Sequence, residues 1–241
     1  DENTIKIGAT AVPHAEILNL IKDDVQKDGY KLEIIEFNDY VKPNLALADG
    51  EIDANYFQHI PYFEDFKQEH KLDLEILCGV HIELFGIFIK YFYDIKEISK
   101  GNVVAIPNDS VNQGRAFLLL EENGLITLNE DAGLTATEND IKDNPYDLEF
   151  KVLEAAQIPR ILKDVDIAVI NGNFALGAEL NPIEDALVLE NENSPYVNVV
   201  AIRSGEDKDA KLQVLKKHLQ SDKVKDYIEK NYNGGVVSAF K

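Results

Sequence analysis

The N-terminal part of the chain alternates between extended and helical patterns, and this alternation restricts the fold more than any other feature. Residues 5–9, 31–37 and 52–59 are predicted to be strands. Apolar spacing predicts helices between them that begin at Pro13 and Pro43, since proline suits the first turn of a helix. Strands that alternate with helices in this way form a parallel sheet covered by helices. We therefore expect an α/β fold.

Two long extended runs, 79–90 and 196–203, are predicted to connect this set of elements to a second one. The first run is longer than an ordinary strand of about 5–6 residues, so it can cross from one lobe to another. We predict two α/β lobes joined by two crossing strands, with residues 1–82 and 199–241 in lobe 1 and residues 83–198 in lobe 2. The remaining predicted elements are helices at 61–70 and around 158–162, strands at 73–78, 103–106, 150–153 and 166–170, and two C-terminal helices near 212–219 and 224–228.

Composition narrows the choice of partner. The 241-residue chain has a formal net charge of −20, which argues against nucleic acid or an anionic membrane surface. Its one cysteine, Cys78, excludes an internal disulfide and is expected to be a buried, inert thiol in an apolar run. No stretch approaches the roughly 18 apolar residues of a membrane span. The start at Asp1, without methionine or a signal-peptide core, is expected of a processed chain.

Residues 103–120 contain the clearest candidate for binding chemistry. A short apolar strand ends at Pro107, a polar turn follows, and Arg115 is predicted to open a helix. Unpaired amides and the positive end of the dipole make a helix start suitable for an anion, and a guanidinium suits a carboxylate. Because the sequence has no phosphate-binding glycine motif, a small carboxylate is favoured. The alternative, that Arg115 is a solvated first-turn arginine, stays open at this point.

Other polar and aromatic residues are predicted near the same site, because ligands in open α/β sheets lie beyond the carboxyl ends of the strands. Asparagine carbonyls would take an ammonium group while Arg115 takes a carboxylate, and aromatic rings on lobe 1 would cover an apolar tail. Such a site suits a zwitterion with an apolar side chain. The residues predicted to form it are Tyr40, Phe57, His59, Tyr62, Asn112, Arg115, Asn171 and Asn198.

Catalytic and metal sites have weaker support in the sequence. Cys78 and His81 are three residues apart on a predicted strand, so they would point to opposite faces. A zinc site built from His59, His81 and acidic residues is a minor alternative. The acidic excess is expected to be mainly a solvated surface, and the sequence has no G-x-S-x-G elbow. We therefore predict no catalytic residues, no metal and no cofactor.

Seven segments occur in an order that resembles one protein family across nearly the whole chain. The chain is similar to the methionine-binding lipoproteins of bacterial ABC importers, the NlpA/MetQ-type substrate-binding proteins. The segments that carry the resemblance are 37–44 (FNDYVKPN), 53–59 (DANYFQH), 107–115 (PNDSVNQGR), 155–160 (AAQIPR), 168–171 (AVIN), 194–198 (SPYVN) and 233–235 (NGG).

This resemblance implies a type II periplasmic-binding fold whose two lobes close over a ligand and deliver it to a membrane permease driven by a separate ATPase. It also implies export and an N-terminal lipid-modified cysteine, absent from this sequence, as the only attachment to the membrane. Tyr40, Phe57, His59 and Tyr62 would surround the thioether. The resemblance assigns the carboxylate and ammonium to the remaining predicted site residues, Asn112, Arg115, Asn171 and Asn198.

One segment departs from the family pattern. Where many members have a His-Ile-Glu-Pro-Met-Gly-Leu-Tyr-like segment, this chain has Leu84, Phe85 and Phe88 in place of the proline, methionine and tyrosine. L-methionine is the expected ligand, with a methionine-containing dipeptide, D-methionine or another apolar amino acid as alternatives. An enzyme acting on a small amino acid and a metal-binding receptor are the competing classes.

Overall fold

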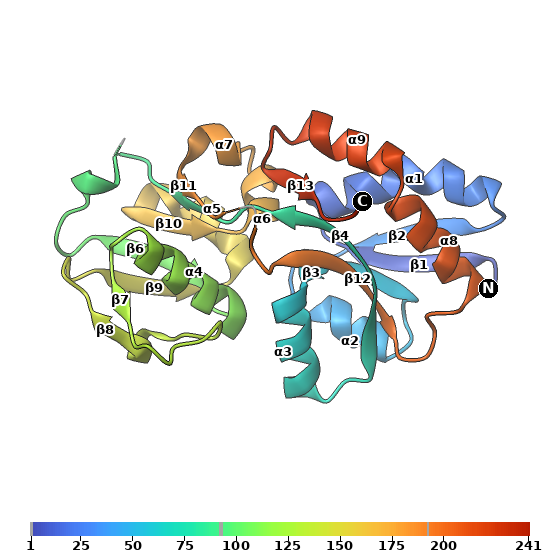
Figure 1. Cartoon of the computed structure of the whole chain (residues 1–241), viewed down its shortest axis with the longest axis horizontal. Helices are drawn as coiled ribbons and strands as arrows, with labels where there is room; N and C mark the ends of the chain where they lie inside the picture. The colour runs from blue at the N-terminus through green and yellow to red at the C-terminus, as the bar shows by residue number, and fades with distance from the viewer. Residues whose placement is uncertain (1, 92–93, 192) are drawn as a thin grey trace. The chain divides into compact units, whose positions relative to one another are not determined.

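The computed structural model describes residues 2–91, 94–191 and 193–241 and divides the chain into two compact units (Figure 1). Unit 1 comprises Asp1–Glu83 and Glu192–Lys241, and unit 2 comprises Leu84–Asn191. The chain therefore passes between the units at residues 83/84 and 191/192. The sequence had placed these passages at 82/83 and 198/199.

Unit 1 is built on a six-stranded sheet with the order β13-β4-β12-β3-β1-β2. The first three strands of the chain pair in parallel, as the alternating pattern predicts, whereas β12 runs antiparallel to both of its neighbours. The strands are β1 (Thr4–Ala9), β2 (Lys31–Glu36), β3 (Ala54–His59), β4 (Leu74–Glu83), β12 (Val197–Arg203) and β13 (Val236–Ser238).

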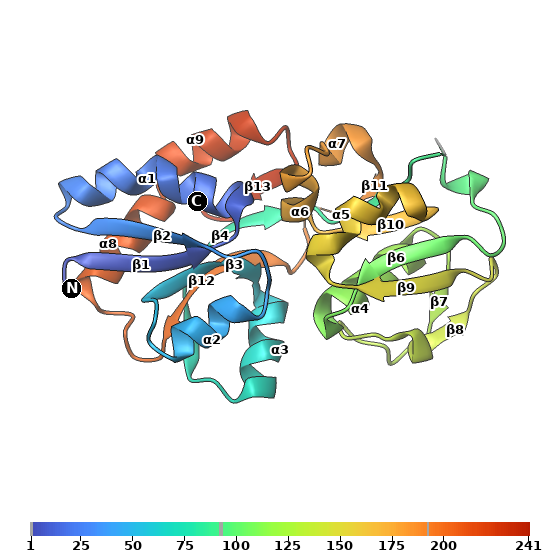
Figure 2. The same ribbon diagram turned by 180° about the vertical axis from the view of Figure 1, so that it is seen from behind.

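Helices cover both faces of this sheet: α1, α8 and α9 lie over one face and α2 and α3 over the other (Figures 1 and 2). The apolar side of α1 explains its position, because Ile17, Leu18 and Ile21 are fully buried. The helices are α1 (Glu16–Lys27), α2 (Lys42–Ala48), α3 (Ile60–His70), α8 (Ala210–Leu219) and α9 (Asp222–Asn231). A π-type turn, η1 (Ala11–Ala15), precedes α1.

Unit 2 contains a five-stranded sheet with the order β11-β5-β10-β6-β9 and a separate β7–β8 pair. Its strands are β5 (Gly86–Phe88), β6 (Val103–Pro107), β7 (Thr127–Leu128), β8 (Ile141–Asp143), β9 (Glu149–Leu153), β10 (Ile167–Ile170) and β11 (Ala186–Leu189). Its α-helices are α4 (Ser110–Glu122), α5 (Ile158–Ile161), α6 (Gly172–Gly177) and α7 (Pro182–Asp185), and short 3-10 turns lie at Ile95–Glu97, Glu138–Asp140, Ala155–Gln157 and Leu162–Asp164.

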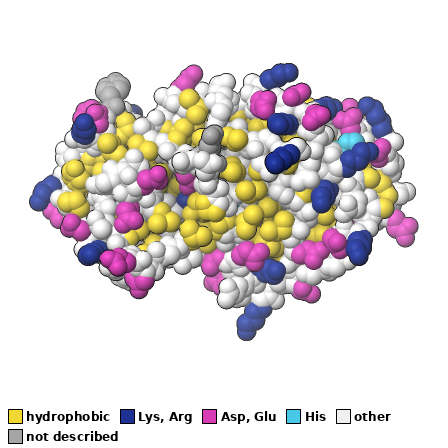
Figure 3. Space-filling model, in the orientation of Figure 1, with side chains coloured by type: hydrophobic (Ala, Val, Ile, Leu, Met, Phe, Trp, Pro, Cys, Tyr) yellow, Lys and Arg dark blue, Asp and Glu magenta, His cyan; other side chains and the backbone are white. Residues whose placement is uncertain are grey.

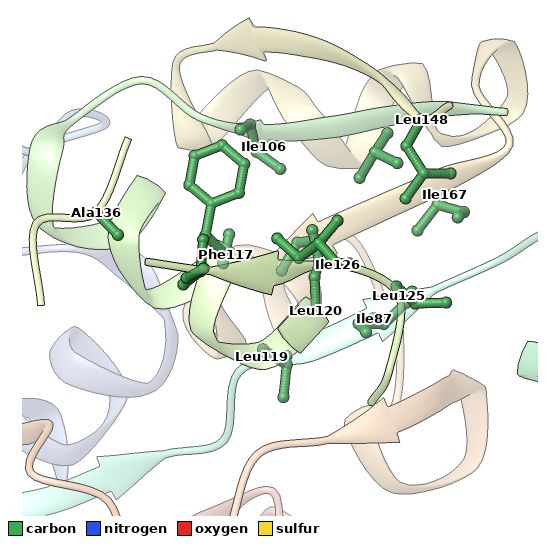
Figure 4. Packing of buried hydrophobic residues seen from close by; sticks show 14 of the residues in the cluster. Ile87, Ile106, Phe117, Leu119, Leu120, Leu125, Ile126, Ala136, Leu148 and Ile167 are labelled. Atoms are coloured by element: carbon green, nitrogen blue, oxygen red, sulfur yellow. The ribbon is translucent and has the colours of Figure 1, made fainter. Parts of the chain in front are cut away.

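The core of unit 2 holds α4 against its sheet. Phe117 and Leu120 on α4 are fully buried in one apolar cluster with Ile106 of β6 and Ile167 of β10 (Figure 4). The Phe117 ring also meets Phe150 edge to face, with 5.1 Å between ring centroids. This packing fixes the helix that carries Asn112 and Arg115.

One sequence prediction about these elements is wrong, and another is refined by the structure. Residues 79–90 do not form one strand, because β4 ends at Glu83 in the sheet of unit 1 and β5 pairs with β10 and β11 in the sheet of unit 2. Helical backbone begins at Pro13, as predicted, because Val12 directly before it is extended, but this first turn is of π type and the α-helix itself begins at Glu16. The short strands β7, β8, β11 and β13 were not predicted from the sequence.

The surface carries charges of both signs. Figure 3 shows acidic and basic side chains interspersed on the visible face. Lys223 lies 2.7 Å from Asp24 and its hydrogen bond lowers the pKa of that carboxyl, while Lys217 lies 3.0 Å from Asp28. Within the described part of the chain, no helix combines the length and the apolar character needed to cross a membrane.

Candidate ligand-binding site

Three of the predicted aromatic residues lie together in unit 1. The ring of Tyr62 has its centroid 5.8 Å from that of Tyr40 and 6.1 Å from that of Phe57. The Tyr62 hydroxyl donates a hydrogen bond of 2.6 Å to the backbone carbonyl of Tyr40, which links α3 to the loop before α2. Phe57 and Tyr62 are both buried, and Phe66 packs in the same cluster. The sequence prediction that these aromatics share a location in lobe 1 agrees with this arrangement.

His59 has a structural role that the sequence analysis did not identify. It is the N-cap of α3, and its Nδ1 accepts a 3.1 Å hydrogen bond from the backbone N–H of Tyr62. The acceptor role leaves the proton of a neutral ring on Nε2. The His59 ring also meets Tyr196 edge to face at 4.9 Å, a partner that the sequence did not suggest.

In unit 2, Asn112 and Arg115 both lie on α4, but the helix begins at Ser110 and not at Arg115. Asp109 is the N-cap, and its carboxylate accepts hydrogen bonds from the backbone N–H of Asn112 (2.9 Å) and from the Asn112 side chain (3.1 Å). Aspartate is among the strongest N-caps, so the polar residues after it fold into the first helical turn. The predicted first-turn position of Arg115 is therefore wrong. Both the backbone N–H and the side-chain amide of Asn112 donate to the Asp109 carboxylate.

Asn171 joins Asn112 at the end of β10, as its position after a strand predicts. The Asn171 Nδ2 donates a 3.2 Å hydrogen bond to Oδ1 of Asn112. Among the described residues, the Oδ1 of Asn171 has no hydrogen-bond partner, although Asn171 is only 4% exposed. A buried acceptor without a donor costs about 1–3 kcal/mol, so this atom is suited to receive a donor from a ligand.

Arg115 is buried in unit 2 and pairs with Glu190, which the sequence analysis did not single out. Its Nε and Nη2 donate to the two carboxylate oxygens of Glu190 at 2.8 and 2.5 Å, and Cζ lies 4.5 Å from the centroid of the Phe85 ring. The open alternative of a solvated first-turn arginine is therefore wrong, because Arg115 is 3% exposed. A guanidinium carries five N–H donors in a planar fork, and this geometry suits carboxylates.

Asn198 lies in unit 1, on β12, directly opposite His59 of β3 and His81 of β4. Its Oδ1 is 2.8 Å from Nε2 of His14, a residue of the turn before α1. That nitrogen is also 3.0 Å from Oε1 of Glu83, and Nε2 of His81 is 2.8 Å from the same oxygen. Asn198 is therefore part of a buried histidine–glutamate cluster. The sequence placed Asn198 in the site and His81 only in a minor zinc alternative, and it did not single out His14 or Glu83.

The protonation states in this cluster follow from burial and hydrogen bonding. Burial alone would raise the pKa of the Glu83 carboxyl, but the contacts with His14 and His81 outweigh it and hold the pKa below its usual range. Burial lowers the pKa of His81 in spite of its contact with Glu83. Burial also raises the pKa of the Cys78 thiol to about 12, so this group is an inert thiol at neutral pH.

We expect Glu83→Gln to make the free energy of unfolding less dependent on pH in the acidic range. Because the pKa of Glu83 is depressed in the folded state, its stabilising contribution is present above the ordinary carboxyl pKa of about 4.3 and is lost as pH falls toward the folded pKa. Urea unfolding should show Glu83→Gln less stable than wild type by about 1–3 kcal/mol at pH 7 and a smaller difference at pH 3. Equal differences at both pH values would contradict this role.

Comparison with known proteins agrees with the fold. The sequence profile of the NlpA lipoprotein family matches residues 5–240. The chain is 41% identical to the methionine-binding lipoprotein MetQ of Bacillus subtilis over 238 residues, which cover 97% of this chain and 87% of the relative.

Two solved structures are similar over almost their full length. A nutrient binding protein from Burkholderia cenocepacia bound to methionine is 40% identical, with a TM-score of 0.95 and coverage of 98% of this chain and 100% of that chain. An ABC transporter periplasmic substrate-binding protein from Coxiella burnetii is 37% identical, with a TM-score of 0.92 and the same coverage. The expected periplasmic-binding fold is confirmed, and the chain belongs to the NlpA lipoprotein family.

Proposed function

We propose that this protein is the substrate-binding protein of an ABC importer, binds L-methionine and delivers it to a permease that a separate ATPase drives. The observation that carries the proposal is the 40% identity, over 98% of this chain, with a protein whose structure is described as bound to methionine. The buried polar groups of unit 2 and the aromatic cluster of unit 1 supply the chemistry that a zwitterion with a thioether tail requires.

Each predicted residue has a proposed role. Arg115, whose guanidinium pairs with Glu190, is proposed to bind the ligand carboxylate as well. The unpartnered Oδ1 of Asn171 accepts from the ligand ammonium, and Asn112 holds the Asn171 amide in place. The side chains proposed to contact the apolar tail and sulfur are Tyr40, Phe57, His59 and Tyr62, and Asn198 is proposed to contact the amino-acid end of the ligand.

Phe57→Ala should weaken methionine binding by about tenfold, because it removes apolar surface and a sulfur–aromatic contact that is itself worth about 0.3–1.5 kcal/mol. Phe66→Ala is the matched control, since Phe66 packs in the same cluster but is not proposed to touch the ligand. Both variants should lose stability in thermal unfolding, and only Phe57→Ala should lose affinity. Equal affinity in the two variants would remove Phe57 from the site.

The choice among similar ligands depends on the segment that departs from the family pattern. Phe85 and Phe88 are buried in the apolar clusters of unit 2, and Phe85 also lies against the guanidinium of Arg115. A change at Phe85 can therefore act on the ligand through Arg115. We propose L-methionine over D-methionine, a methionine dipeptide and leucine.

Thermal unfolding with each of these ligands tests the choice. A ligand present at 1,000 times its Kd adds about 4 kcal/mol of stability, so the preferred ligand gives the largest increase in Tm at equal concentration. A larger increase with D-methionine, glycyl-methionine or leucine would replace L-methionine as the ligand.

The family is one of substrate-binding transport proteins, and the name of the family marks its members as lipoproteins. We propose that this member acts outside the cytoplasm of a bacterial cell, attached to the cell membrane by an N-terminal lipid, and releases its ligand unchanged. Chemical conversion of methionine during hours of incubation with the protein would favour the competing enzyme hypothesis instead.

A further inference from the structure

A row of three side chains crosses the sheet of unit 1 next to the buried histidine–glutamate cluster. His59, Asn198 and His81 are direct neighbours on β3, β12 and β4, and paired residues in antiparallel strands point to the same face. Glu83 lies two residues after His81 on β4, which places it on that face as well. Asn198 thus lies between a residue proposed to contact ligand and the cluster of His14, His81 and Glu83.

The hydrogen bonds of this cluster determine which amide atom of Asn198 faces His14. An ionised Glu83 carboxylate accepts only, so the Nε2 atoms of His14 (3.0 Å) and His81 (2.8 Å) must both carry protons. A protonated Nε2 of His14 can approach Asn198 at 2.8 Å only if the amide presents its oxygen, as the structure has it. The other ring nitrogens are held by hydroxyls, Nδ1 of His14 by Thr10 (2.8 Å) and Nδ1 of His81 by Tyr56.

This arrangement leaves the Nδ2 group of Asn198 for a ligand. Within the described part of the chain, Nδ2 takes part in no hydrogen bond, whereas Oδ1 is occupied by His14. An amide that presents only N–H groups complements a carboxylate and repels an ammonium. Asn198 and Asn171 therefore offer opposite chemistry, since Asn171 presents an unpartnered oxygen.

We propose that Glu83 and His14 are positioning residues that fix the amide of Asn198, so that Asn198 donates from Nδ2 to the ligand carboxylate. This inference rests on the proposed function and corrects the expectation that every asparagine of the site offers its carbonyl to the ammonium. The chain of contacts runs from the Glu83 carboxylate through Nε2–H of His14 to Oδ1 of Asn198.

The same three side chains, His14, His81 and Glu83, also have the composition of a metal site, with their ligand atoms within 4.8 Å of one another. A metal would have to replace the Nε2 protons that the hydrogen bonds to Glu83 require. It would also remove the donor that Asn198 accepts from. The hydrogen-bonded cluster accounts for all of these contacts without an ion.

Side-chain amide NMR on the wild-type protein tests the orientation of Asn198 directly. The cross-peaks of its NH₂ group are assigned as those missing from Asn198→Ala. We expect them to shift with L-methionine and with 4-(methylthio)butanoate, which keeps the carboxylate, and not with 3-(methylthio)propylamine, which keeps the ammonium. A shift with the amine alone would overturn the inference. No binding of L-methionine at all would instead overturn the proposed function.

Variants test the role of His14. His14→Leu removes the donor and should weaken L-methionine binding by about tenfold or more, whereas His14→Gln, whose amide can donate from a similar position, should stay within about threefold of wild type. In an Asn198→Ala background, His14→Leu should have no further effect on affinity. His218→Leu, which removes a different histidine–carboxylate contact (2.8 Å to Asp28), is the matched control.

Two results would contradict the positioning role. One is an equal loss of affinity from His14→Leu whether or not residue 198 is asparagine, which would show a purely structural effect. The other is an equivalent of zinc bound by the wild-type protein and lost in His14→Leu, which would assign the cluster to a metal. If His14→Leu does not fold, the NMR experiment on the wild-type protein still decides the orientation of Asn198.

Discussion

Replacing both members of the buried ion pair, Arg115→Gln together with Glu190→Gln, is expected to abolish most methionine binding in a protein that still folds. Arg115→Ala alone should cost about 1.5–3 kcal/mol of binding, the range for hydrogen bonds to charged groups. The single change also leaves the Glu190 carboxylate buried without its partner, and breaking such a pair typically costs about 3–5 kcal/mol of folding stability. The double variant removes that second effect because no charge is left buried.

Calorimetric titration and urea unfolding on the same samples separate the two effects. Glu190→Gln alone is the control, since it keeps the guanidinium and should retain methionine binding better than the double variant. The expected order of affinity is wild type and Glu190→Gln above the double variant. Unchanged affinity in the double variant would remove Arg115 from the proposed site and leave it a structural ion pair.

Gly114→Ala should destabilise unit 2 by about 3 kcal/mol or more and weaken methionine binding with it. A Cβ at this position of α4 would lie 2.1 Å from the carbonyl oxygen of Leu134 and 2.8 Å from the amide nitrogen of Ala136. Both atoms are backbone, so relief requires movement of the helix or of the loop, which costs more than the usual 1–3 kcal/mol of overpacking. Movement of α4 also displaces Asn112 and Arg115.

Gly177→Ala on α6 is the matched control. A Cβ there meets no heavy atom within 4 Å, and alanine is favoured over glycine in a helix by up to about 1 kcal/mol. Thermal unfolding should therefore show Gly177→Ala equal to or slightly more stable than wild type. A Gly114→Ala protein as stable as the Gly177→Ala protein would contradict the close packing of α4 against residues 134–136.

The fold class and the positions of several candidate residues within their own elements could be predicted from the sequence. Alternating apolar patterns identified β1, β2 and β3, and the position of Asn171 directly after an apolar run predicted its location at the end of β10. These inferences succeeded because they depend on contacts between residues close in the chain. The start of α4 was misplaced because the cap, Asp109, was counted as part of a polar turn.

The partners of the candidate residues could not be predicted in the same way. Glu190 is 75 residues from Arg115 and lies in an acidic stretch that has the composition of a solvated surface. His14 is 184 residues from Asn198, and nothing in its local sequence marks it as different from the other histidines. Such pairs depend on tertiary packing, so a single sequence carries no local signal for them.

Calorimetric titration of the protein with L-methionine, after unfolding and refolding to remove any carried ligand, tests the central claim most directly. We predict saturable binding of one methionine per chain and recovery of the ligand unchanged. The absence of saturable binding at millimolar methionine, in a protein that circular dichroism shows to be refolded, would contradict the proposed function.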